Sequence, residues 1–264
     1  MENIIRRLLE KLMRGRVRLR KLPADAGGGK IYMSDAGGLG ALLKPMSKQD
    51  PVLINAAKFM VKPGNTIWDI GGNLGIFSAV SSYLSTSKGS VYTFEPDVEI
   101  IKLLRKTAQQ QSPQNAAMNI VPSAVAKTTG LRQFHIAARA RASNSFADYG
   151  NTQQGGVLET QTVVALSLDD CLQWLPKPDV VKIDVEGAEH ELLFDSANLL
   201  RTARPIILCE VSIGNEEIIS RAFLSNDYVM FDVEKEYKLD NQIKKAVWNT
   251  LGIPKEKLAD YLPE

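Results

Sequence analysis

An acidic residue and a group of glycines stand together from Asp69 onward, where the chain reads Asp-Ile-Gly-Gly-Asn-Leu-Gly. The run follows an apolar segment of strand length and precedes a segment with helical spacing. Glycine lets the backbone approach a ligand closely, and the free amides at a helix start favour an electron-rich group. We therefore expect Gly71, Gly72, Asn73 and Gly75 to form a binding loop, with the Asp69 carboxylate placed to meet an ammonium group.

A second acidic residue, Glu95, follows the next apolar segment and precedes Pro96. An acidic side chain at this position of an α/β sheet accepts hydrogen bonds from ribose hydroxyls. The dinucleotide pattern G-x-G-x-x-G is absent, because Asn73 and Ile76 occupy two of its glycine positions, and no Gly-Lys-Ser/Thr motif follows. The two motifs together indicate a nucleoside that carries an amino group, although each alone is compatible with a tight structural turn.

The elements that position these residues alternate between strand and helix. Apolar segments of strand length cover 66–70, 90–94, 180–184 and 205–211, and segments with helical spacing cover 76–84, 98–109 and 188–200. Such alternation predicts a mostly parallel sheet with right-handed crossovers. Between the two groups we expect a hairpin made by 123–126 and 131–136, followed by a long loop over 140–156.

Length and composition fit one α/β domain with extensions. The 264 residues are 44% apolar and 23% charged, which excludes a disordered, collagen-like or disulfide-stapled chain. Asp50 is a helix N-cap candidate followed by Pro51, so we expect the catalytic domain to cover 50–234. Residues 1–49 would form an extension with a basic amphipathic helix and a short strand. Residues 235–264 would form a helical tail, packed on the sheet edge or on a second subunit.

Positive charge is concentrated at the N-terminus. Residues 1–22 contain eight basic and two acidic side chains, a local charge of +6, and since the whole chain carries +2 the remainder carries −4. A body of this charge argues against a protein that grips long nucleic acid, so no nucleic acid partner is expected. The apolar positions Ile4, Ile5, Leu8 and Leu9 recur at helical spacing. This helix could contact an anionic membrane surface, dock a partner, including a second copy of the chain, or fold back onto the body.

Cysteine content and hydropathy indicate the cellular compartment in which the protein is expected. Cys171 and Cys209 are the two cysteines, too few for a disulfide framework, and no Cys-x-x-Cys motif suggests zinc. No apolar run reaches the roughly 18 residues of a membrane span, and the N-terminus lacks the pattern of a secretory signal. We expect a cytoplasmic protein.

Three blocks of the sequence are similar to the FkbM family of S-adenosylmethionine-dependent methyltransferases. They are Trp-Asp-Ile-Gly-Gly-Asn-Leu-Gly-Ile-Phe-Ser at 68–78, Val-Tyr-Thr-Phe-Glu-Pro at 91–96, and Val-Val-Lys-Ile-Asp-Val-Glu-Gly-Ala-Glu at 180–189. The resemblance implies an α/β, Rossmann-like class I methyltransferase fold, with a mostly parallel seven-stranded sheet and helices on both faces. It also implies methyl transfer to an oxygen, typically a hydroxyl of a sugar or other small metabolite.

The matched positions carry the family's ligand contacts onto this chain. The resemblance implies that the loop residues from Gly71 to Gly75 line the methionine part of S-adenosylmethionine, with Asp69 near its amino group. Glu95 would hold the ribose, and Ser123 and Ala124 would flank the adenine.

The third block, together with Glu210 further along the chain, supplies the candidates for catalysis. Asp184 ends a strand of an open α/β sheet, where the ligand crevice lies, so it is the first candidate for the general base or a metal ligand. Glu186 and Glu210 would complete an oxygen-rich set that suits Mg²⁺. The three carboxylates could instead cap a helix or pair with Lys182 and Arg204.

The two histidines are further candidates for a proton acceptor. His190 lies six residues after Asp184 and could act as a base, or could be a solvated helix residue. His135 lies in a predicted strand and is expected to be structural. Family members often carry a histidine where this chain has Ser212, which weakens the case for a histidine base there. The segment 104–109 and the pair at 194–195 also depart from the family pattern.

The leading hypothesis is an O-methyltransferase acting on a hydroxyl of a sugar, glycan or glycosylated small metabolite. One alternative is a nucleic-acid 2′-O-methyltransferase, for which the basic N-terminus is the argument. Another is a non-catalytic Rossmann-like nucleoside-binding module that kept the fold without turnover.

Overall fold

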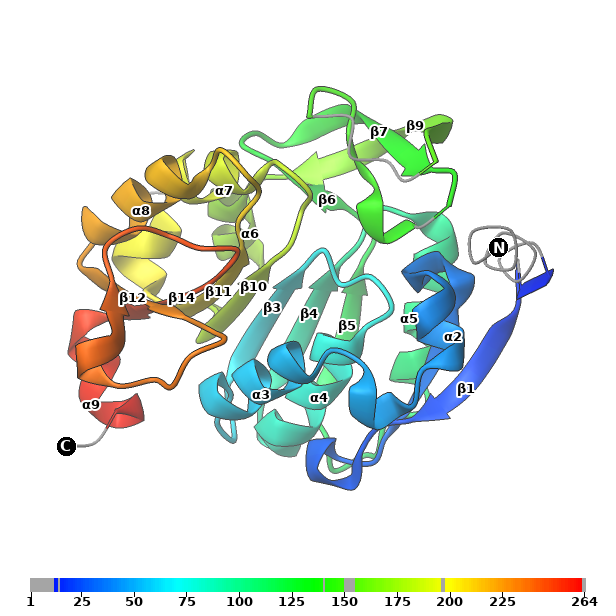
Figure 1. Ribbon diagram of the computed structural model, residues 1–264, viewed down its shortest axis with the longest axis horizontal. Helices are drawn as coiled ribbons and strands as arrows, with labels where there is room; N and C mark the ends of the chain where they lie inside the picture. Colours follow the sequence, from blue (N-terminus) through cyan, green and yellow to red (C-terminus); the bar gives the residue numbers. More distant parts are fainter. Residues whose placement is uncertain (1–11, 14, 140, 150–154, 196–197, 263–264) are drawn as a thin grey trace, which may run out of the picture.

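The computed structural model describes residues 12–13, 15–139, 141–149, 155–195 and 198–262 (Figure 1). Its centre is an eight-stranded sheet with the order β13-β12-β14-β11-β10-β3-β4-β5. Five neighbouring strands run parallel, namely β11 (Ile206–Glu210), β10 (Val180–Ile183), β3 (Thr66–Ile70), β4 (Ser90–Phe94) and β5 (Ala117–Val121). The expected Rossmann-like class I methyltransferase fold is confirmed. The eighth strand is the two-residue β13 (Gln242–Ile243) at the edge.

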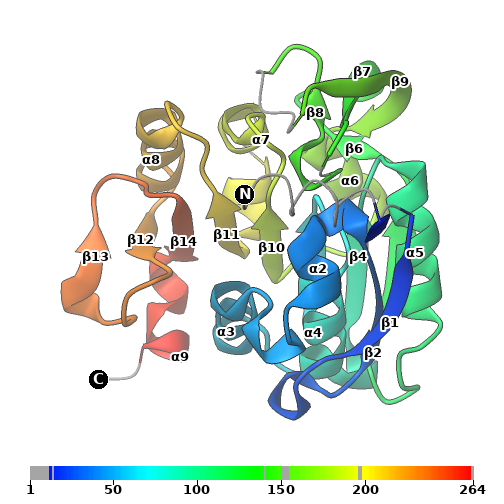
Figure 2. The ribbon, with the colours of Figure 1, turned by 45° about the vertical axis from the view of Figure 1, so that its right-hand side comes forward.

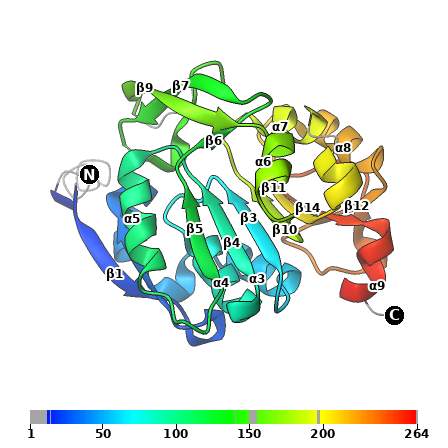
Figure 3. The same cartoon turned by 180° about the vertical axis from the view of Figure 1, so that it is seen from behind.

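The helices form two groups that cover opposite faces of this sheet. Helices α3 (Pro51–Met60), α4 (Ile76–Ser85) and α5 (Val98–Ala108) share one apolar core with the sheet. Helices α6 (Leu168–Trp174), α7 (Glu189–Asp195) and α8 (Glu216–Leu224) share the other (Figures 1 and 3). Successive residues of a strand point into opposite cores. Ile67 belongs to the first core and Trp68 to the second.

Local sequence explains where these helices begin and end. Asp50 caps α3 by accepting a hydrogen bond from Leu53 N, and proline occupies the first helical position, as predicted. Asp97 caps α5 in the same way through Glu99 N. Helix α7 covers Glu189–Asp195, inside the segment 188–200 that helical spacing predicts, and a π-helical turn lies at Leu199–Ala203.

The N-terminal extension forms a hairpin of β1 (Val17–Lys21) and β2 (Lys30–Ser34) that lies along α5 (Figure 2). Tyr32 N donates to Thr107 Oγ1 of α5 at 3.0 Å. The short helix α2 (Leu39–Leu43) connects this hairpin to α3. Most of the predicted amphipathic helix, residues 1–11 and 14, lies outside the described residues, so its membrane or partner contacts stay predictions.

A second sheet of four strands, in the order β6-β9-β7-β8, corrects the predicted hairpin. Strand β9 (Val157–Leu166) lies between β6 (Ala124–Val125) and β7 (Gly130–Ala137), so the two expected partners do not pair. The reason is that β7 pairs antiparallel with β9 from Gly130 to Ala137, whereas β6 is two residues long. Part of the predicted loop forms β8 (Ser145–Phe146), which pairs with β7.

The C-terminal segment differs from the expected helical tail. Strand β14 (Asn249–Pro254) is inserted antiparallel between β11 and β12 (Tyr228–Asp232), and the one α-helix described there is the four-residue α9 (Leu258–Tyr261). Gly252 permits this insertion, because a Cβ at that position would lie 2.5 Å from the Phe223 ring of α8. The tail therefore builds the sheet, while the division at 49/50 and 234/235 stays a prediction. In the described part of the chain, no helix has the length and apolar character needed to cross a membrane.

Candidate active site at the carboxyl edge of the sheet

The glycine loop between β3 and α4 packs tightly against the segment that follows β10. Gly71 and Gly75 have positive φ angles of 75° and 81°. A Cβ on Gly71 would lie 1.8 Å from the Asp184 carbonyl oxygen, so a larger residue would displace one of the two segments. The amides of Gly71 and Gly72 donate to Phe94 O at 3.1 and 3.0 Å, which fixes the loop to the end of β4.

Glu95 lies at the end of β4 with its carboxylate held by two backbone amides. Its Oε2 accepts from Asn73 N at 3.0 Å, and its Oε1 accepts from Asp97 N at 2.9 Å. Burial raises the pKa of Glu95 to about 8, against the opposing effect of these amide hydrogen bonds. Each carboxylate oxygen retains a further lone pair, and the residue lines a cleft, so Glu95 can accept from two neighbouring hydroxyls.

Ser123 and Ala124 line the same cleft as Glu95, and residues of the second sheet form part of its wall. Ser123 Oγ is buried and has no hydrogen-bond partner among the described residues, which leaves it available to a ligand. Phe134 and Phe146 of β7 and β8 contribute apolar surface to this wall. An unpaired hydroxyl beside aromatic side chains suits a heteroaromatic base such as adenine.

Arg141 and Asn144, two residues that sequence reasoning missed, hold that wall in place. Arg141 Nη1 and Asn144 Nδ2 donate to Asp97 Oδ2 at 2.6 and 2.9 Å. Asp97 is fully buried and donates its own amide to Glu95, so the β7–β8 loop is coupled to the predicted ribose contact. The pairing joins residues 44 and 47 positions apart, and no local pattern signals it.

Asp69 lies behind the glycine loop, which corrects the expectation that it faces a ligand. Its side chain is fully buried and is absent from the described residues that line the cleft. Asp69 Oδ2 accepts from Ser78 Oγ at 2.5 Å, and Oδ1 lies 3.3 Å from Lys182 Nζ. The ammonium group that Asp69 meets within the protein is therefore that of Lys182.

Lys182 links the glycine loop to the residues expected to perform catalysis. Its buried Nζ donates to Gly71 O at 2.8 Å and lies 3.2 Å from Asp184 Oδ2. Burial acts to lower the pKa of Lys182, but the charges of Asp184 and Asp69 outweigh it and the pKa is raised. The sequence contained a signal for the role of Lys182. A lysine interrupts the apolar strand two residues before Asp184, so the two side chains lie on the same face.

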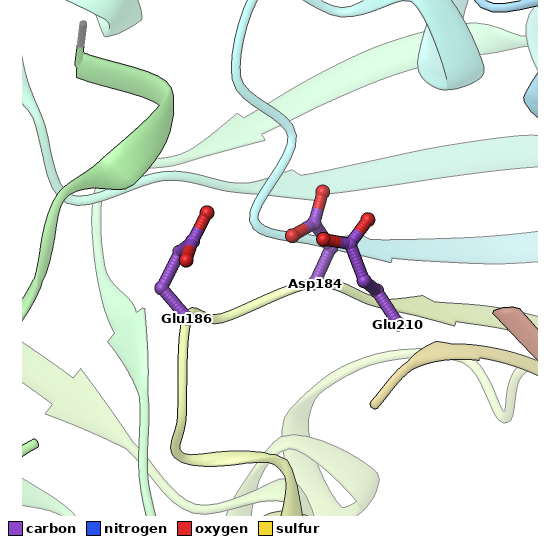
Figure 4. A group of neighbouring side chains, drawn as sticks. All are labelled: Asp184, Glu186 and Glu210. Atoms are coloured by element: carbon purple, nitrogen blue, oxygen red, sulfur yellow. The ribbon is translucent and has the colours of Figure 1, made fainter. Parts of the chain in front are cut away.

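The structure brings Asp184, Glu186 and Glu210 together (Figure 4). One carboxylate oxygen from each lies within 4.8 Å of the others. Burial, with the charge of Asp184 as a second cause, raises the pKa of Glu186 to about 7 and that of Glu210 to about 8. The oxygen donors and the mutual repulsion fit a Mg²⁺ ion. Lys182, however, already places a positive charge beside Asp184.

Neither histidine lies among the described residues that line this cleft. His190 Nδ1 is 3.1 Å from Gly187 O, and its ring packs edge-on against Tyr149 at 5.5 Å. The expectation that His190 acts as a base therefore has no geometric support. His135 lies in β7, in keeping with the structural role expected for it.

Ser212, where the resemblance to the family suggested a histidine, makes a structural contact. Its Oγ donates to Glu189 Oε1 at 3.0 Å. The nearly fully buried Glu189 also accepts from Gly187 N at 2.7 Å and from Asn215 Nδ2 at 2.9 Å. These hydrogen bonds connect the segment after β10 to the loop after β11. They therefore help to fix the position of Asp184 relative to Glu210.

Asp184 also lines a second hollow. Asp50, Asp184 and Glu210 line it together with Val233 and Trp248. Asp184 thus belongs to the wall of both this hollow and the cleft that contains Glu95 and Ser123. Such a shared residue can act on a group that passes from one ligand to another.

Comparison with known proteins agrees with this geometry. The sequence profile of the methyltransferase FkbM domain matches residues 69–232. The chain belongs to the FkbM methyltransferase family. It is accordingly an S-adenosylmethionine-dependent methyltransferase.

Relatives of this FkbM methyltransferase are distant in sequence. Hexuronic acid methyltransferase AglP of Haloferax volcanii is 23% identical over 180 residues, which cover 66% of this chain and 69% of AglP. A solved FkbM methyltransferase of Methylobacillus flagellatus is 12% identical with a TM-score of 0.48, and the match covers 95% of this chain and 58% of that one. Fibrillarin of Aeropyrum pernix, solved with natively bound S-adenosylmethionine, is 12% identical with a TM-score of 0.40 over 91% of this chain and 85% of that one.

Proposed function

We propose that this FkbM methyltransferase transfers the methyl group of S-adenosylmethionine to a hydroxyl of a sugar, glycan or glycosylated small metabolite. The observation that carries the proposal is the position of Asp184 on the wall of both the donor cleft and the adjoining hollow. A carboxylate there can take a proton from an acceptor in the hollow while the acceptor oxygen faces the donor.

The donor contacts follow from the cleft. Glu95 would accept from the ribose hydroxyls, and Ser123 Oγ with the neighbouring Ala124 would meet the adenine. Gly71, Gly72, Asn73 and Gly75 would follow the methionine part. Asp69 would act through Lys182, because it has no surface on the cleft.

The protein contributes alignment and proton transfer. When bound, S-adenosylmethionine supplies a methyl group already activated by its sulfonium, so the remaining task is to position and deprotonate the acceptor. Asp184 accepts the hydroxyl proton while the new carbon–oxygen bond forms and the carbon–sulfur bond breaks. Lys182 Nζ, 3.2 Å from Asp184, stabilises the carboxylate before transfer. Glu210, whose pKa is about 8, carries its proton at neutral pH and can donate a hydrogen bond to the acceptor.

A Mg²⁺ ion held by Asp184, Glu186 and Glu210 is a second arrangement for orienting the acceptor. Lys182 already balances the charge of Asp184, so we expect EDTA to leave turnover unchanged. Turnover would be measured before and after EDTA treatment and again with added Mg²⁺. A loss with EDTA that Mg²⁺ restores would assign these carboxylates to a metal.

A sugar acceptor agrees with the hollow and with the similarity to a hexuronic acid methyltransferase. Asp50, Asp184 and Glu210 line the hollow, and carboxylates commonly accept hydrogen bonds from sugar hydroxyls. A negatively charged head would meet the carboxylates of Asp50 and Asp184 against the single positive charge of Lys182, so we expect an uncharged sugar. This acidic lining also disfavours the phosphates of RNA, the acceptor of the alternative 2′-O-methyltransferase.

Calorimetric titration with S-adenosylhomocysteine tests the donor site. We expect micromolar binding that Glu95→Ala weakens by about 1–3 kcal/mol, the cost of leaving buried ribose hydroxyls without their hydrogen-bond partner. Glu99→Ala is the matched control, because Glu99 is an exposed acid on α5 paired with Lys102. Absence of binding by the wild type would contradict the proposal. Transfer of labelled methyl to uncharged glycosides, to a glucuronide and to RNA would then identify the acceptor class, and binding without any transfer would favour the non-catalytic alternative.

A further inference from the structure

An apolar groove adjoins the acceptor hollow. Val211, Ile213, Ala246, Val247 and Trp248 line it, and Glu216 and Lys245 complete its border. Ile213 is 89% exposed and Trp248 is 51% exposed. Large apolar side chains that stay exposed beside a functional cleft commonly mark a binding surface.

The loop that carries Ile213 is held in this exposed position by its own hydrogen bonds. Asn215 N donates to Ser212 O at 3.0 Å, and Gly214 N donates to Glu216 Oε2 at 2.9 Å. Asn215 Nδ2 is bonded to the buried Glu189 at 2.9 Å. Ile213 is therefore presented outward by an anchored loop and contributes little to the core.

Trp248 joins the groove to the acceptor hollow, because it lines both. Its carbonyl accepts from Val211 N at 2.7 Å, and the next residue, Asn249, pairs in register with Glu210. The backbone of Trp248 is thus fixed in position relative to Glu210. One continuous surface runs from carboxylates at one end to exposed apolar side chains at the other.

We propose that the acceptor is amphiphilic, with a hydroxylated head in the hollow of Asp184 and Glu210 and an apolar aglycone along Trp248 and Ile213. This inference rests on the proposed function and specifies its substrate class. Contact with the aglycone would remove both exposed side chains from water. A protein partner fits the groove less well, because stable interfaces bury about 800 Å² on each side and this surface presents two large exposed apolar side chains.

Paired alkyl glycosides test the inference on the full chain loaded with S-adenosylhomocysteine. Methyl and octyl glycosides with the same uncharged sugar head, for a series of hexoses, would be titrated below the micelle concentration of the octyl member. We expect the octyl member of at least one pair to bind about tenfold or more tightly than its methyl partner. Ile213→Ser should remove most of this preference.

Leu158→Ser is the matched control, since Leu158 is a 60% exposed apolar residue of β9 outside the groove, and it should keep the preference. Equal affinity for the octyl and methyl members, no binding by any pair, or an octyl preference that survives Ile213→Ser would each overturn the inference. So would a concentration-dependent dimer that Ile213→Ser abolishes, because a second copy would then occupy the groove. Binding of S-adenosylhomocysteine, measured first, separates these outcomes from failure of the proposed function.

Discussion

Lys182 contacts both the glycine loop and Asp184, the proposed general base. Its ammonium contacts Gly71 O, Asp69 and Asp184 at distances between 2.8 and 3.3 Å, and it is buried. Removing one partner from a buried ionic group leaves the others uncompensated, which is more costly than losing an exposed pair.

Lys182→Met should therefore destabilise the fold by about 3–5 kcal/mol and reduce turnover more than it reduces donor affinity. Urea unfolding, calorimetry with S-adenosylhomocysteine and turnover would be compared. Lys102→Met is the matched control, because Lys102 forms an exposed pair with Glu99 and should change stability by no more than about 0.5 kcal/mol. Equal effects of the two substitutions would argue against a linking role for Lys182.

Glu95 should make stability depend on pH. Its pKa of about 8 in the fold lies above the ordinary value of 4.5, so the folded state binds this proton more tightly than the unfolded state. The contribution is full below pH 4.5 and is lost as the pH rises toward 8. From pH 5 to pH 9, the stability of Glu95→Gln relative to the wild type should rise by at least about 1.4 kcal/mol, the equivalent of one pKa unit. Thermal unfolding of both proteins across this range is the measurement, and a pH-independent difference would contradict it.

The sequence predicted which residues lie near the site better than it predicted where their side chains point. Glu95 lines the cleft as its position after a strand indicated, and so does Ser123, which the family resemblance implied. Asp69 follows the same logic but faces inward, because the partner that attracts it, Lys182, comes from a strand more than 100 residues later. Such a partner has no local signature.

At the scale of elements, the close contact between the glycine loop and the segment after β10 sets the spacing of the site. Gly71→Ala would place a Cβ 1.8 Å from Asp184 O at a φ of 75°, so it combines a clash with backbone strain. We expect a loss of stability well above the roughly 1 kcal/mol of strain alone, together with weaker donor binding.

Gly64→Ala is the comparison for this substitution. Gly64 has a φ of 88°, but the nearest atom to an added Cβ is 4.0 Å away. Thermal unfolding should therefore show a small loss for Gly64→Ala and a much larger one for Gly71→Ala. Losses of similar size would show that strain, and not close packing against Asp184, is the constraint.

Elements defined by short-range pattern were predicted well, and elements defined by a distant partner were not. β3 and β4 match their predicted bounds because each is a short run rich in β-branched and aromatic residues between turn residues. The hairpin prediction was wrong because β9 supplies the partner for both β6 and β7. β14 contains glycine and proline, which weaken any strand pattern, and its place between two earlier strands depends on topology.

At the scale of the whole molecule, the C-terminal segment is part of the main sheet and should behave as core. Leu251 of β14 is fully buried, so Leu251→Ala should cost about 2–5 kcal/mol in urea unfolding. Leu239→Ala, in the same segment but about half exposed, should stay within about 0.5 kcal/mol. Similar small effects at both positions would indicate a tail that adds little to the sheet.

The strand order also imposes an order on folding. β12 has two sheet neighbours in the described structure, β14 and β13, and both follow it in the chain. Until those segments are synthesised, four buried residues of β12, from Tyr228 to Phe231, have no strand to pair with. An unpaired apolar strand is a template for association with other chains. During synthesis the chain therefore passes through a stage, between β12 and β14, at which it is prone to aggregate and at which a chaperone can bind the unpaired strand.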